Sequence, residues 1–394
     1  MYKRPQYYEL LERLKESRFT IQAIVGPRQI GKSTMVKQVL DDISIPSLFV
    51  SADNIDEDNT AWISETWESA RAMLKLNGGK EYILVIDEIH KIKNWSEIVK
   101  KEWDYDSLNS INIKLIILGS SRILMKDGLT ESLAGRYELI RMTHWLYKEV
   151  SEAFGATLEQ FIFFGGYPGG YRLINNQPRW RKYIKDSIIT PSIEKDILLT
   201  KRLYKPALMK QLFELGCLYS GQEISFTKLL GQLQDAGNTT TLANYLSVLN
   251  ESQLLSGLQK FANDNARRYG SIPKMAVYDT ALLSALSGSK FEDIFVQPSK
   301  WGRWVESAIG MILLNFAVDD DCKVYYWREK DSEVDFVVVN NGNVTAIEVK
   351  SGLHVNSKGL SDFVKKFNPK NSYIVGSGGI PLSNFFTADP SFLS

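Results

Sequence analysis

Long apolar runs without polar alternation mark the first third of the chain. They are found at residues 19–25 (FTIQAIV), 82–86 (YILVI) and 113–118 (IKLIIL). Runs of this kind predict strands that are buried on both faces, as in a parallel sheet covered by helices. After the first run, Met35, Val36, Val39 and Leu40 recur at helical spacing. The pattern therefore predicts an α/β fold whose first strand is followed directly by a helix.

The middle of the chain changes to a helical pattern followed by a short hairpin. Residues 207–219 form an amphipathic stretch, residues 225–235 a shorter one, and residues 239–258 begin as a third helix and end in an apolar run. Helix, short helix, helix and hairpin is the order of a winged helix-turn-helix. Residues 201–275 hold 9 Lys and Arg against 5 Asp and Glu, a net charge of +4. This permits DNA contact, and the alternatives are protein contact or packing.

The last third returns to strands. A helix is predicted around residues 301–317, three strands over residues 322–351, and a further helix and strand over residues 358–377. We interpret this region as a second, separate α/β domain. The stretch FFGGYPGGYRL at residues 163–173 is dense in glycine and aromatic residues. We interpret it as a helix end and packed turn, and the alternative is a loop that stacks on a nucleotide or on DNA.

Composition limits the classes of protein to consider. The 394 residues suffice for two or three domains, and the formal net charge of +1 means that any nucleic-acid surface must be local. Two cysteines and three histidines argue against a disulfide framework and against a structural zinc site. The first residues, MYKRPQYYEL, lack an apolar core, and no apolar run reaches 18 residues. We therefore expect a cytoplasmic protein without a membrane span.

The segment GPRQIGKST matches the phosphate-loop pattern G-x-x-x-x-G-K-[ST], between a predicted strand and a predicted helix. Backbone N–H groups of such a loop surround the β-phosphate, and the helix N-terminus adds partial positive charge. Lys32 is expected to contact the β- and γ-phosphates, and Ser33 to bind Mg²⁺. The predicted nucleotide-binding residues of the loop are Gly26, Pro27, Arg28, Gln29, Ile30, Gly31, Lys32, Ser33 and Thr34.

Two carboxylates follow the second buried run. Asp87 and Glu88 come directly after Ile86, at the expected carboxyl edge of the sheet, where ligands of open α/β sheets bind. We expect Asp87 to hold Mg²⁺ through water and Glu88 to polarise the attacking water. The alternative is two solvated acids at a strand end.

Two further positions are candidates for the same reaction. Ser120 or Ser121, at the end of the third run, is expected to orient the water against the γ-phosphate; the alternative is a plain strand-end cap. Arg136, in SLAGRYELI, is expected to reach the γ-phosphate in its own chain or as an arginine finger in a neighbour's site. The alternative for Arg136 is a surface arginine.

Together, GPRQIGKST, ILVIDEIHKI, LGSS and SLAGR resemble the AAA-type ATPases of bacteria and archaea whose C-terminal part is catalogued as a domain of unknown function. The resemblance implies a P-loop ATPase with a helical lid that includes residues 163–173. It also implies ATP and Mg²⁺ as cofactors. By analogy with AAA-type proteins, it implies a homo-oligomer, expected as a six-membered ring.

A second set of polar residues lies in the C-terminal third. Glu306 falls in the predicted helix, Asp335 in the second strand, and Glu348 and Lys350 on one face of the third strand. The intervening turn makes Asp335 and the Glu348–Lys350 pair neighbours across a hairpin. This arrangement resembles the restriction-endonuclease-like superfamily. It implies that Asp335 and Glu348 bind Mg²⁺ or Mn²⁺, with Glu306 at a second metal or metal-bound water and Lys350 acting on the attacking water. The alternative is acids and lysine paired on a solvent face.

We therefore predict three modules: an AAA-type P-loop ATPase with its lid (residues 1–200), a winged helix-turn-helix (201–275) and a nuclease-like α/β domain (276–394). This combination indicates Mg²⁺-dependent ATP hydrolysis coupled to the binding or processing of DNA, as structured or branched DNA in repair, recombination or defence. One alternative is an ATP-dependent regulatory switch that acts on a protein partner, with a non-catalytic C-terminal fold. Another is an ATP-gated, metal-dependent nuclease. If the regulatory switch is correct, the basic residues of the winged helix and those of the C-terminal edge should not form one continuous surface.

Overall fold

A computed structural model of the chain describes residues 1–120, 125, 128–130, 132–197, 205–233, 238–262, 271–318, 322–352, 357–389 and 392. The chain forms two compact units, Met1–Thr143 and His144–Ser394, and each is described by itself. In the described ranges, no helix is both long and apolar enough to cross a membrane.

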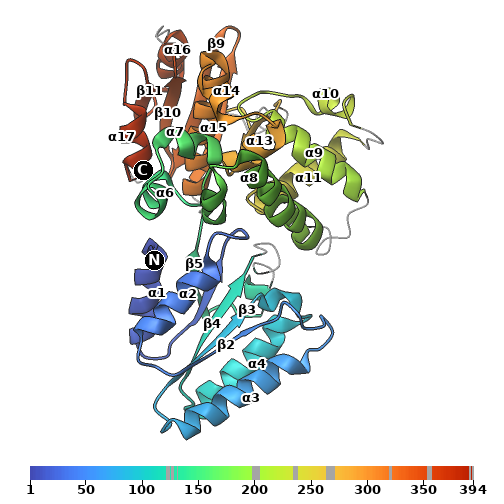
Figure 1. The fold of residues 1–394 in the computed structure, drawn as a ribbon, viewed down its shortest axis with the longest axis vertical. Coiled ribbons are helices and arrows are strands. Elements are labelled where there is room, and N and C mark those ends of the chain that lie inside the picture. The colour runs from blue at the N-terminus through green and yellow to red at the C-terminus, as the bar shows by residue number, and fades with distance from the viewer. Residues whose placement is uncertain are drawn as a thin grey trace. The chain divides into compact units, whose positions relative to one another are not determined.

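The first unit is built on a five-stranded parallel sheet with the order β2-β3-β4-β1-β5 (Figure 1). Its strands are Ile21–Val25 (β1), Ser47–Ser51 (β2), Tyr82–Asp87 (β3), Ile113–Gly119 (β4) and Tyr137–Arg141 (β5). Every residue of β1, β3 and β4 is buried, which confirms the interpretation of the uninterrupted apolar runs. The edge strands β2 and β5 are partly exposed.

Helices cover both faces of this sheet, with α1 and α2 on one side and α3 and α4 on the other (Figure 1). The helical segments are Pro5–Lys15 (α1), Lys32–Asp42 (α2), Ala61–Leu76 (α3), Ile89–Lys91 (the 3₁₀ helix η1) and Trp95–Leu108 (α4). Trp67 of α3 and Trp103 of α4 are buried in the core against the sheet. Because all five strands are parallel, their carboxyl ends meet at one edge, where α/β proteins bind ligands.

The second unit opens with short helices. They are Tyr147–Phe154 (α6), Leu158–Phe164 (α7), Pro168–Leu173 (η2), Gln177–Tyr183 (α8) and the π-helical turns Ile184–Ile189 (η3) and Ser192–Ile197 (η4). Gly165 ends α7 with φ 74°, and Phe163 and Phe164 before it are buried. The interpretation of residues 163–173 as a helix end with a packed turn is confirmed.

Three helices and a two-stranded hairpin follow. They are Pro206–Leu218 (α9), Phe226–Leu230 (α10), Thr239–Glu251 (α11), Leu255–Leu258 (β6) and Lys274–Val277 (β7). The strands β6 and β7 pair antiparallel. The predicted order of helix, short helix, helix and hairpin is present, while its assignment as a winged helix-turn-helix stays a prediction.

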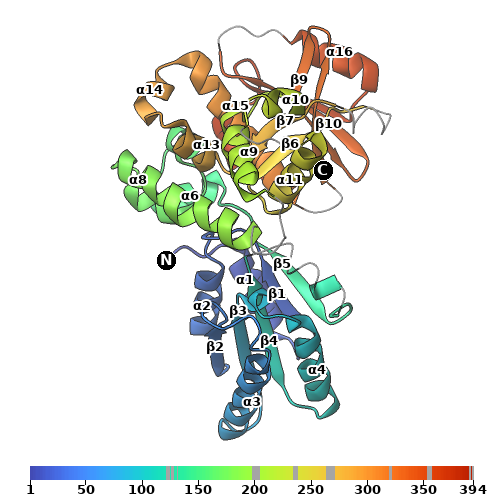
Figure 2. The same cartoon turned by 90° about the vertical axis from the view of Figure 1, so that its right-hand side faces the viewer.

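The unit ends with a four-stranded sheet of order β11-β10-β9-β8, on which α16 packs against β9 and β10 (Figure 2). The strands β8, β9 and β10 are antiparallel neighbours, whereas β11 is parallel to β10 after the crossover through α16. The elements are Thr280–Ser287 (α13), Phe291–Phe295 (α14), Pro298–Phe316 (α15), Cys322–Glu329 (β8), Ser332–Asn340 (β9), Asn343–Lys350 (β10), Lys358–Phe367 (α16), Asn371–Gly376 (β11) and Leu382–Thr387 (α17).

The boundary between the compact units lies at Thr143. Residues 144–197, which belong to the predicted ATPase module of residues 1–200, group in compactness with the second unit. The reason is packing, because α7 and α8 both contact α13. The division into modules at residues 200 and 275 stays a prediction.

Candidate functional site

The phosphate loop connects β1 to α2 and borders a cavity of about 230 Å³. Gly31 is the N-cap of α2 and has φ 95°, in the region that favours glycine. Gly26 cannot carry a side chain, because a Cβ there would lie 2.1 Å from the carbonyl oxygen of Met142. The cavity is lined by Arg28, Gln29, Gly31, Lys32, Ser33, Thr34, Asp53, Asp87 and Glu88. Among the predicted nucleotide-binding residues, Gly26, Pro27 and Ile30 are absent from this lining.

Lys32 is held inside its own loop. Its Nζ donates to the carbonyl oxygens of Gly26, at 2.8 Å, and Pro27, at 2.7 Å. The residue is only 6% exposed, so burial and these two acceptors fix the ammonium beside the cavity. Ile30, in contrast, is fully buried and supports the loop through packing.

Ser33 and Asp87 meet across the cavity. Ser33 Oγ donates to Asp87 Oδ2 at 2.7 Å, while Asp87 Oδ1 is buried and has no hydrogen-bond partner in the described part of the chain. Burial raises the pKa of Asp87, although the bond from Ser33 lowers it. A hydroxyl and a carboxylate with an unused oxygen are the hard ligands that Mg²⁺ prefers. The residues present therefore fit a nucleotide-bound Mg²⁺.

Glu88 and Ser120 come together at the ends of neighbouring strands. Ser120 Oγ donates to Glu88 Oε2 at 2.7 Å. Glu88 also has φ 53°, a left-handed conformation that is uncommon for residues other than glycine. Such strain persists where the surroundings enforce it, and it recurs at active sites. Ser121, the other candidate, lies outside the described residues.

Two residues of this edge were missed by the sequence analysis. His90 is almost completely buried, and its Nε2 lies 3.4 Å from Glu88 Oε2. Burial lowers the pKa of His90 to about 4, so the ring is neutral at neutral pH. Asp53 lines the cavity and forms an ion pair with Lys91. The signal that could have identified Asp53 is its position just after β2, at the same carboxyl edge of the sheet as Asp87.

Arg136 lies at the opposite edge of the sheet. It precedes β5, whose first residue Tyr137 is paired in register with Ile21, the first residue of β1. The phosphate loop follows the other end of β1, about 16 Å away at about 3.3 Å per strand residue. Arg136 also forms a two-pronged contact with Asp104, at 2.8 and 3.0 Å. Its predicted action within its own chain is therefore wrong, and action in a neighbour's site stays a prediction.

The C-terminal acids are neighbours, as the hairpin pattern predicted. Asp335 Oδ2 accepts a 2.7 Å hydrogen bond from the backbone N–H of Val349, between Glu348 and Lys350. Lys350 Nζ contacts Glu348 Oε1 at 2.5 Å. Burial raises the pKa of Glu348.

Lys274 of β7, which the sequence analysis missed, points into this group. Its Nζ lies 2.6 Å from Glu306 Oε1, 3.5 Å from Asp335 Oδ1 and 3.6 Å from Glu333 Oε1. Burial raises the pKa of Glu306 to about 7, against the opposing effect of the Lys274 ammonium. Burial alone would lower the pKa of Lys274, but the surrounding carboxylates raise it overall.

The predicted second metal site is therefore not supported. Within the described ranges, no group of three or more His, Cys, Asp or Glu residues is arranged to hold a metal ion. The physical reason is that the ammonium of Lys274 already contacts Glu306 and Asp335, two of the three predicted metal ligands. We name Lys274, Glu306, Glu333, Asp335, Glu348 and Lys350 the C-terminal charge cluster.

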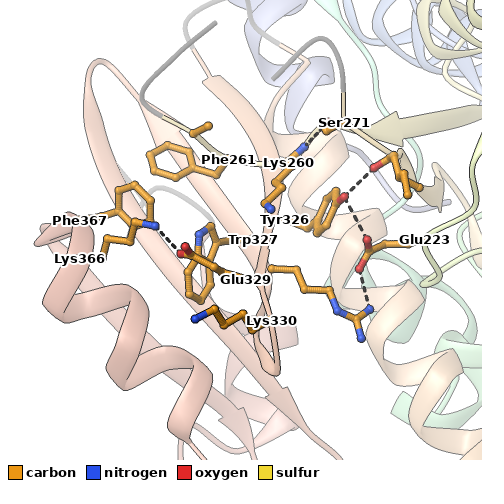
Figure 3. A pocket seen from close by; sticks show the side chains of 13 residues that line it. Glu223, Lys260, Phe261, Ser271, Tyr326, Trp327, Glu329, Lys330, Lys366 and Phe367 are labelled. Carbon is orange, nitrogen blue, oxygen red and sulfur yellow. Dashed lines mark hydrogen bonds and ion pairs between the residues drawn. The ribbon is translucent and has the colours of Figure 1, made fainter. Parts of the chain in front are cut away.

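A further cavity, of about 690 Å³, lies where the end of the hairpin meets β8 and α16 (Figure 3). Phe261, Trp327 and Phe367 provide apolar lining, and the cations are Lys260, Arg328, Lys330 and Lys366. We call this cavity the basic groove. Arg328 pairs with Glu223 at 2.9 Å, and Lys366 pairs with Glu329. Lys260 and Lys330 have no acidic partner within 4.0 Å among the residues that the structure describes, so their charges face the groove.

Three segments of the chain match the models of protein families. Residues 18–151 match the family model described as an AAA domain. Residues 155–293 and 301–383 match two domains of unknown function, DUF8612 and DUF4143. The first part of the chain thus matches an AAA domain, and two domains of unknown function follow it, as the sequence resemblance implied.

Known relatives carry no functional description. The chain is 26% identical to the uncharacterized protein Rv2008c of Mycobacterium tuberculosis, over 83% of this chain and 69% of the relative. The uncharacterized protein Mb2031c of Mycobacterium bovis matches to the same extent. An uncharacterized protein of Haemophilus influenzae is 28% identical over 39% of this chain and 38% of its own length.

Solved structures show only weak likeness. The Holliday junction branch migration motor RuvB of Thermotoga maritima is 14% identical, with a TM-score of 0.34 over 64% of this chain and 88% of that one. The Aeropyrum pernix ORC1 protein in complex with DNA is 11% identical, with a TM-score of 0.28 over 73% of this chain and 92% of that one.

Proposed function

We propose that this protein hydrolyses ATP with Mg²⁺ and couples hydrolysis to the binding or processing of DNA. One observation carries the ATPase part of the proposal. Lys32, the Ser33–Asp87 pair and the Glu88–Ser120 pair all stand at the carboxyl edge of one parallel sheet, around or beside one cavity. This arrangement supports the roles that we propose for the two pairs.

The residues divide the reaction between them. When the nucleotide binds, Lys32 Nζ donates hydrogen bonds to phosphate oxygens in place of the carbonyl oxygens of Gly26 and Pro27. Its positive charge then stabilises the leaving diphosphate. Ser33 and Asp87 would hold the Mg²⁺ of the nucleotide, and that ion would neutralise charge on the phosphates. Glu88 orients a water and accepts its proton as the water oxygen attacks the γ-phosphorus and the bond to the diphosphate oxygen breaks. Ser120 fixes the Glu88 carboxylate through its 2.7 Å hydrogen bond.

The basic groove supports DNA as the partner. Lys260 comes from the predicted winged-helix module and Lys330 and Lys366 from the C-terminal domain, yet they line one cavity. Two of the groove's cations are partly neutralised by Glu223 and Glu329. Phosphate contacts supply most of the non-specific affinity for DNA, and lysines from both modules are available for them at this groove. We therefore favour DNA over the alternative of a regulatory switch for a protein partner. The aromatic side chains Tyr326 and Trp327 are buried, so we expect backbone contacts rather than base stacking.

The ATP-gated nuclease is the weaker alternative, because Lys274 lies among the acids that would have to bind its metal. We further propose a homo-oligomer, by analogy a six-membered ring, in which Arg136 reaches the nucleotide of the next subunit. Its position away from its own phosphate loop is compatible with that role.

The test is the steady-state ATPase rate without DNA and with single-stranded, duplex and four-way-junction DNA. Lys32→Ala serves as the blank. Stimulation of several-fold by one DNA form supports the coupled motor and identifies its substrate. A Lys32-dependent rate that no DNA changes refutes the coupling to DNA and favours the protein-partner switch.

The groove is tested separately by DNA affinity. The double variant K260E/K330E reverses two groove charges, and K323E reverses an exposed charge on β8 as the matched control. We expect K260E/K330E to weaken duplex binding by about 10-fold or more and K323E to have little effect. Equal losses in both variants would mean that general charge, rather than the groove, determines binding.

A further inference from the structure

We infer that the ammonium of Lys274 takes the place of a divalent cation in the C-terminal charge cluster, so that this chain does not bind Mg²⁺ or Mn²⁺ there. The inference does not depend on the ATPase or on DNA. The acids follow a metal-site pattern in the sequence, but in the structure a buried lysine supplies positive charge to them.

The first observation is the position of the charge. Lys274 Nζ lies 2.6 Å from Glu306 on α15 and 3.5 Å from Asp335 on β9. It is 2% exposed, and its Nζ is also 3.4 Å from the backbone carbonyl of Asp335. A single buried ammonium thus contacts two of the three acids that the sequence pattern assigned to metals, one from each predicted ion. Since like charges repel strongly in a buried site, a divalent cation cannot bind to the same two carboxylates while Lys274 stays.

The second observation is that the acids are only partly compensated. Glu348 is 6% exposed, and its Oε2 is buried without a hydrogen-bond partner in the described part of the chain. Its other oxygen contacts Lys350. A buried carboxylate oxygen without a partner is costly and favours any cation that can reach it. Removing Lys274 would therefore leave carboxylates on α15, β9 and β10 arranged around a missing positive charge.

The third observation concerns where Lys274 comes from. It is the first residue of β7, in the hairpin, whereas its partners Glu306, Glu333 and Asp335 belong to α15 and β9. The side chain therefore ties the hairpin to the C-terminal sheet. Removing one partner of such a buried charge pair destabilises a protein, because the other partner is left as an uncompensated buried charge.

The experiment measures Mn²⁺ binding by the electron paramagnetic resonance signal of the free ion, with metal-dependent thermal stability as a second measurement. All proteins carry Asp87→Asn, so that the nucleotide site contributes little. The parent is compared with D335N, K274M and K274M/D335N. K323M, which removes an exposed lysine from β8, is the control for the loss of one positive charge.

We expect the parent, D335N and K323M to give the same weak binding. K274M should bind Mn²⁺ at least about tenfold tighter and gain thermal stability with the metal, and K274M/D335N should lose both gains. Two results would overturn the inference. One is Mn²⁺ binding by the parent that D335N removes, and the other is a folded K274M without a new site.

A K274M variant that does not fold would be replaced by K274Q, which keeps a neutral hydrogen-bond donor. If neither variant folds, Mn²⁺ binding by the parent is compared with Mn²⁺ binding by D335N. Equal binding supports the inference, and tighter binding by the parent refutes it.

Discussion

Ser120 Oγ donates a 2.7 Å hydrogen bond to Glu88 Oε2, although the two residues lie 32 positions apart in the chain. The bond joins the carboxyl ends of the neighbouring parallel strands β3 and β4. It places a strained carboxylate next to the cavity that Lys32 and Asp87 line. This relationship is what we expect of a site that hydrolyses its nucleotide rather than only binding it.

Substituting Glu88 should stop hydrolysis and leave nucleotide binding intact. Glu88→Gln keeps the shape but cannot accept the proton of the water, so we expect kcat to fall by about 10²- to 10⁴-fold. Ser120→Ala should cost roughly 10-fold, from about 1.5 kcal/mol for a hydrogen bond to a charged group. Phosphate release and binding of a fluorescent nucleotide measure the two effects. Ser69→Ala, which removes an exposed serine on α3, is the matched control, and a similar loss there would contradict a specific role for Ser120.

Arg136 should act only between subunits. Arg136→Ala should leave nucleotide affinity unchanged, since Arg136 is remote from its own phosphate loop. If Arg136 is an arginine finger, its loss should lower kcat by roughly 10³-fold or more. Mixing R136A with Lys32→Ala should then restore part of the activity, because each protein supplies what the other lacks. Asp104→Asn breaks the same ion pair without removing the arginine, and an equal loss in D104N would indicate a structural role instead.

Gly165 and Gly155 both end helices with positive φ, but their backbones differ. Gly155 (φ 68°, ψ 23°) is in the left-handed helical region, where alanine should cost about 1–2 kcal/mol of stability. Gly165 (φ 74°, ψ −159°) is in a region open essentially to glycine alone, so its backbone cost is larger. At Gly165 the new Cβ would also lie 1.8 Å from Asp279 Oδ1, while at Gly155 nothing lies within 4 Å. We expect Gly165→Ala to cost about 1–3 kcal/mol more than Gly155→Ala in urea unfolding. Equal losses would show that both the contact with Asp279 and the backbone strain at Gly165 are readily relieved.

Asp279 should make stability depend on pH. It is fully buried, and burial raises the pKa of its carboxyl from 3.8 to about 7 against the two hydrogen bonds that it accepts from Gly166 and Ala281. Between these two values the folded chain holds a proton that the unfolded chain releases. The contribution of Asp279 to the free energy of unfolding is therefore present below about pH 4 and is lost as the pH rises to about 7.

Asp279→Asn should remove this dependence, because the amide does not titrate. At about 1.4 kcal/mol per pKa unit, the difference between the parent and D279N should change by several kcal/mol between pH 4 and pH 7. Urea unfolding of both proteins across that range provides the measurement. Parallel curves would mean that Asp279 is ionised in the folded protein throughout.

The sequence alone determined the local features of the ATPase half. Uninterrupted apolar runs predicted β1, β3 and β4, because a strand buried on both faces has no polar positions to alternate. The spacing of Gly26, Gly31 and Lys32 predicted the phosphate loop, since its conformation depends on neighbouring residues and on glycine. The hairpin between Asp335 and Glu348 was predictable for the same local reason.

Only the tertiary structure decided which side chains oppose each other across elements distant in sequence. Arg136 lies at the far edge of the sheet because β5 pairs with β1 in one register, which no local pattern specifies. Asp53 lines the cavity because the end of β2 packs beside the end of β3. Lys274 enters the C-terminal acids from the hairpin, more than 30 residues before Glu306 in the sequence. Electrostatic partners are set by distance in space, so a metal-like pattern of acids could be read from the sequence while the cation that neutralises it could not.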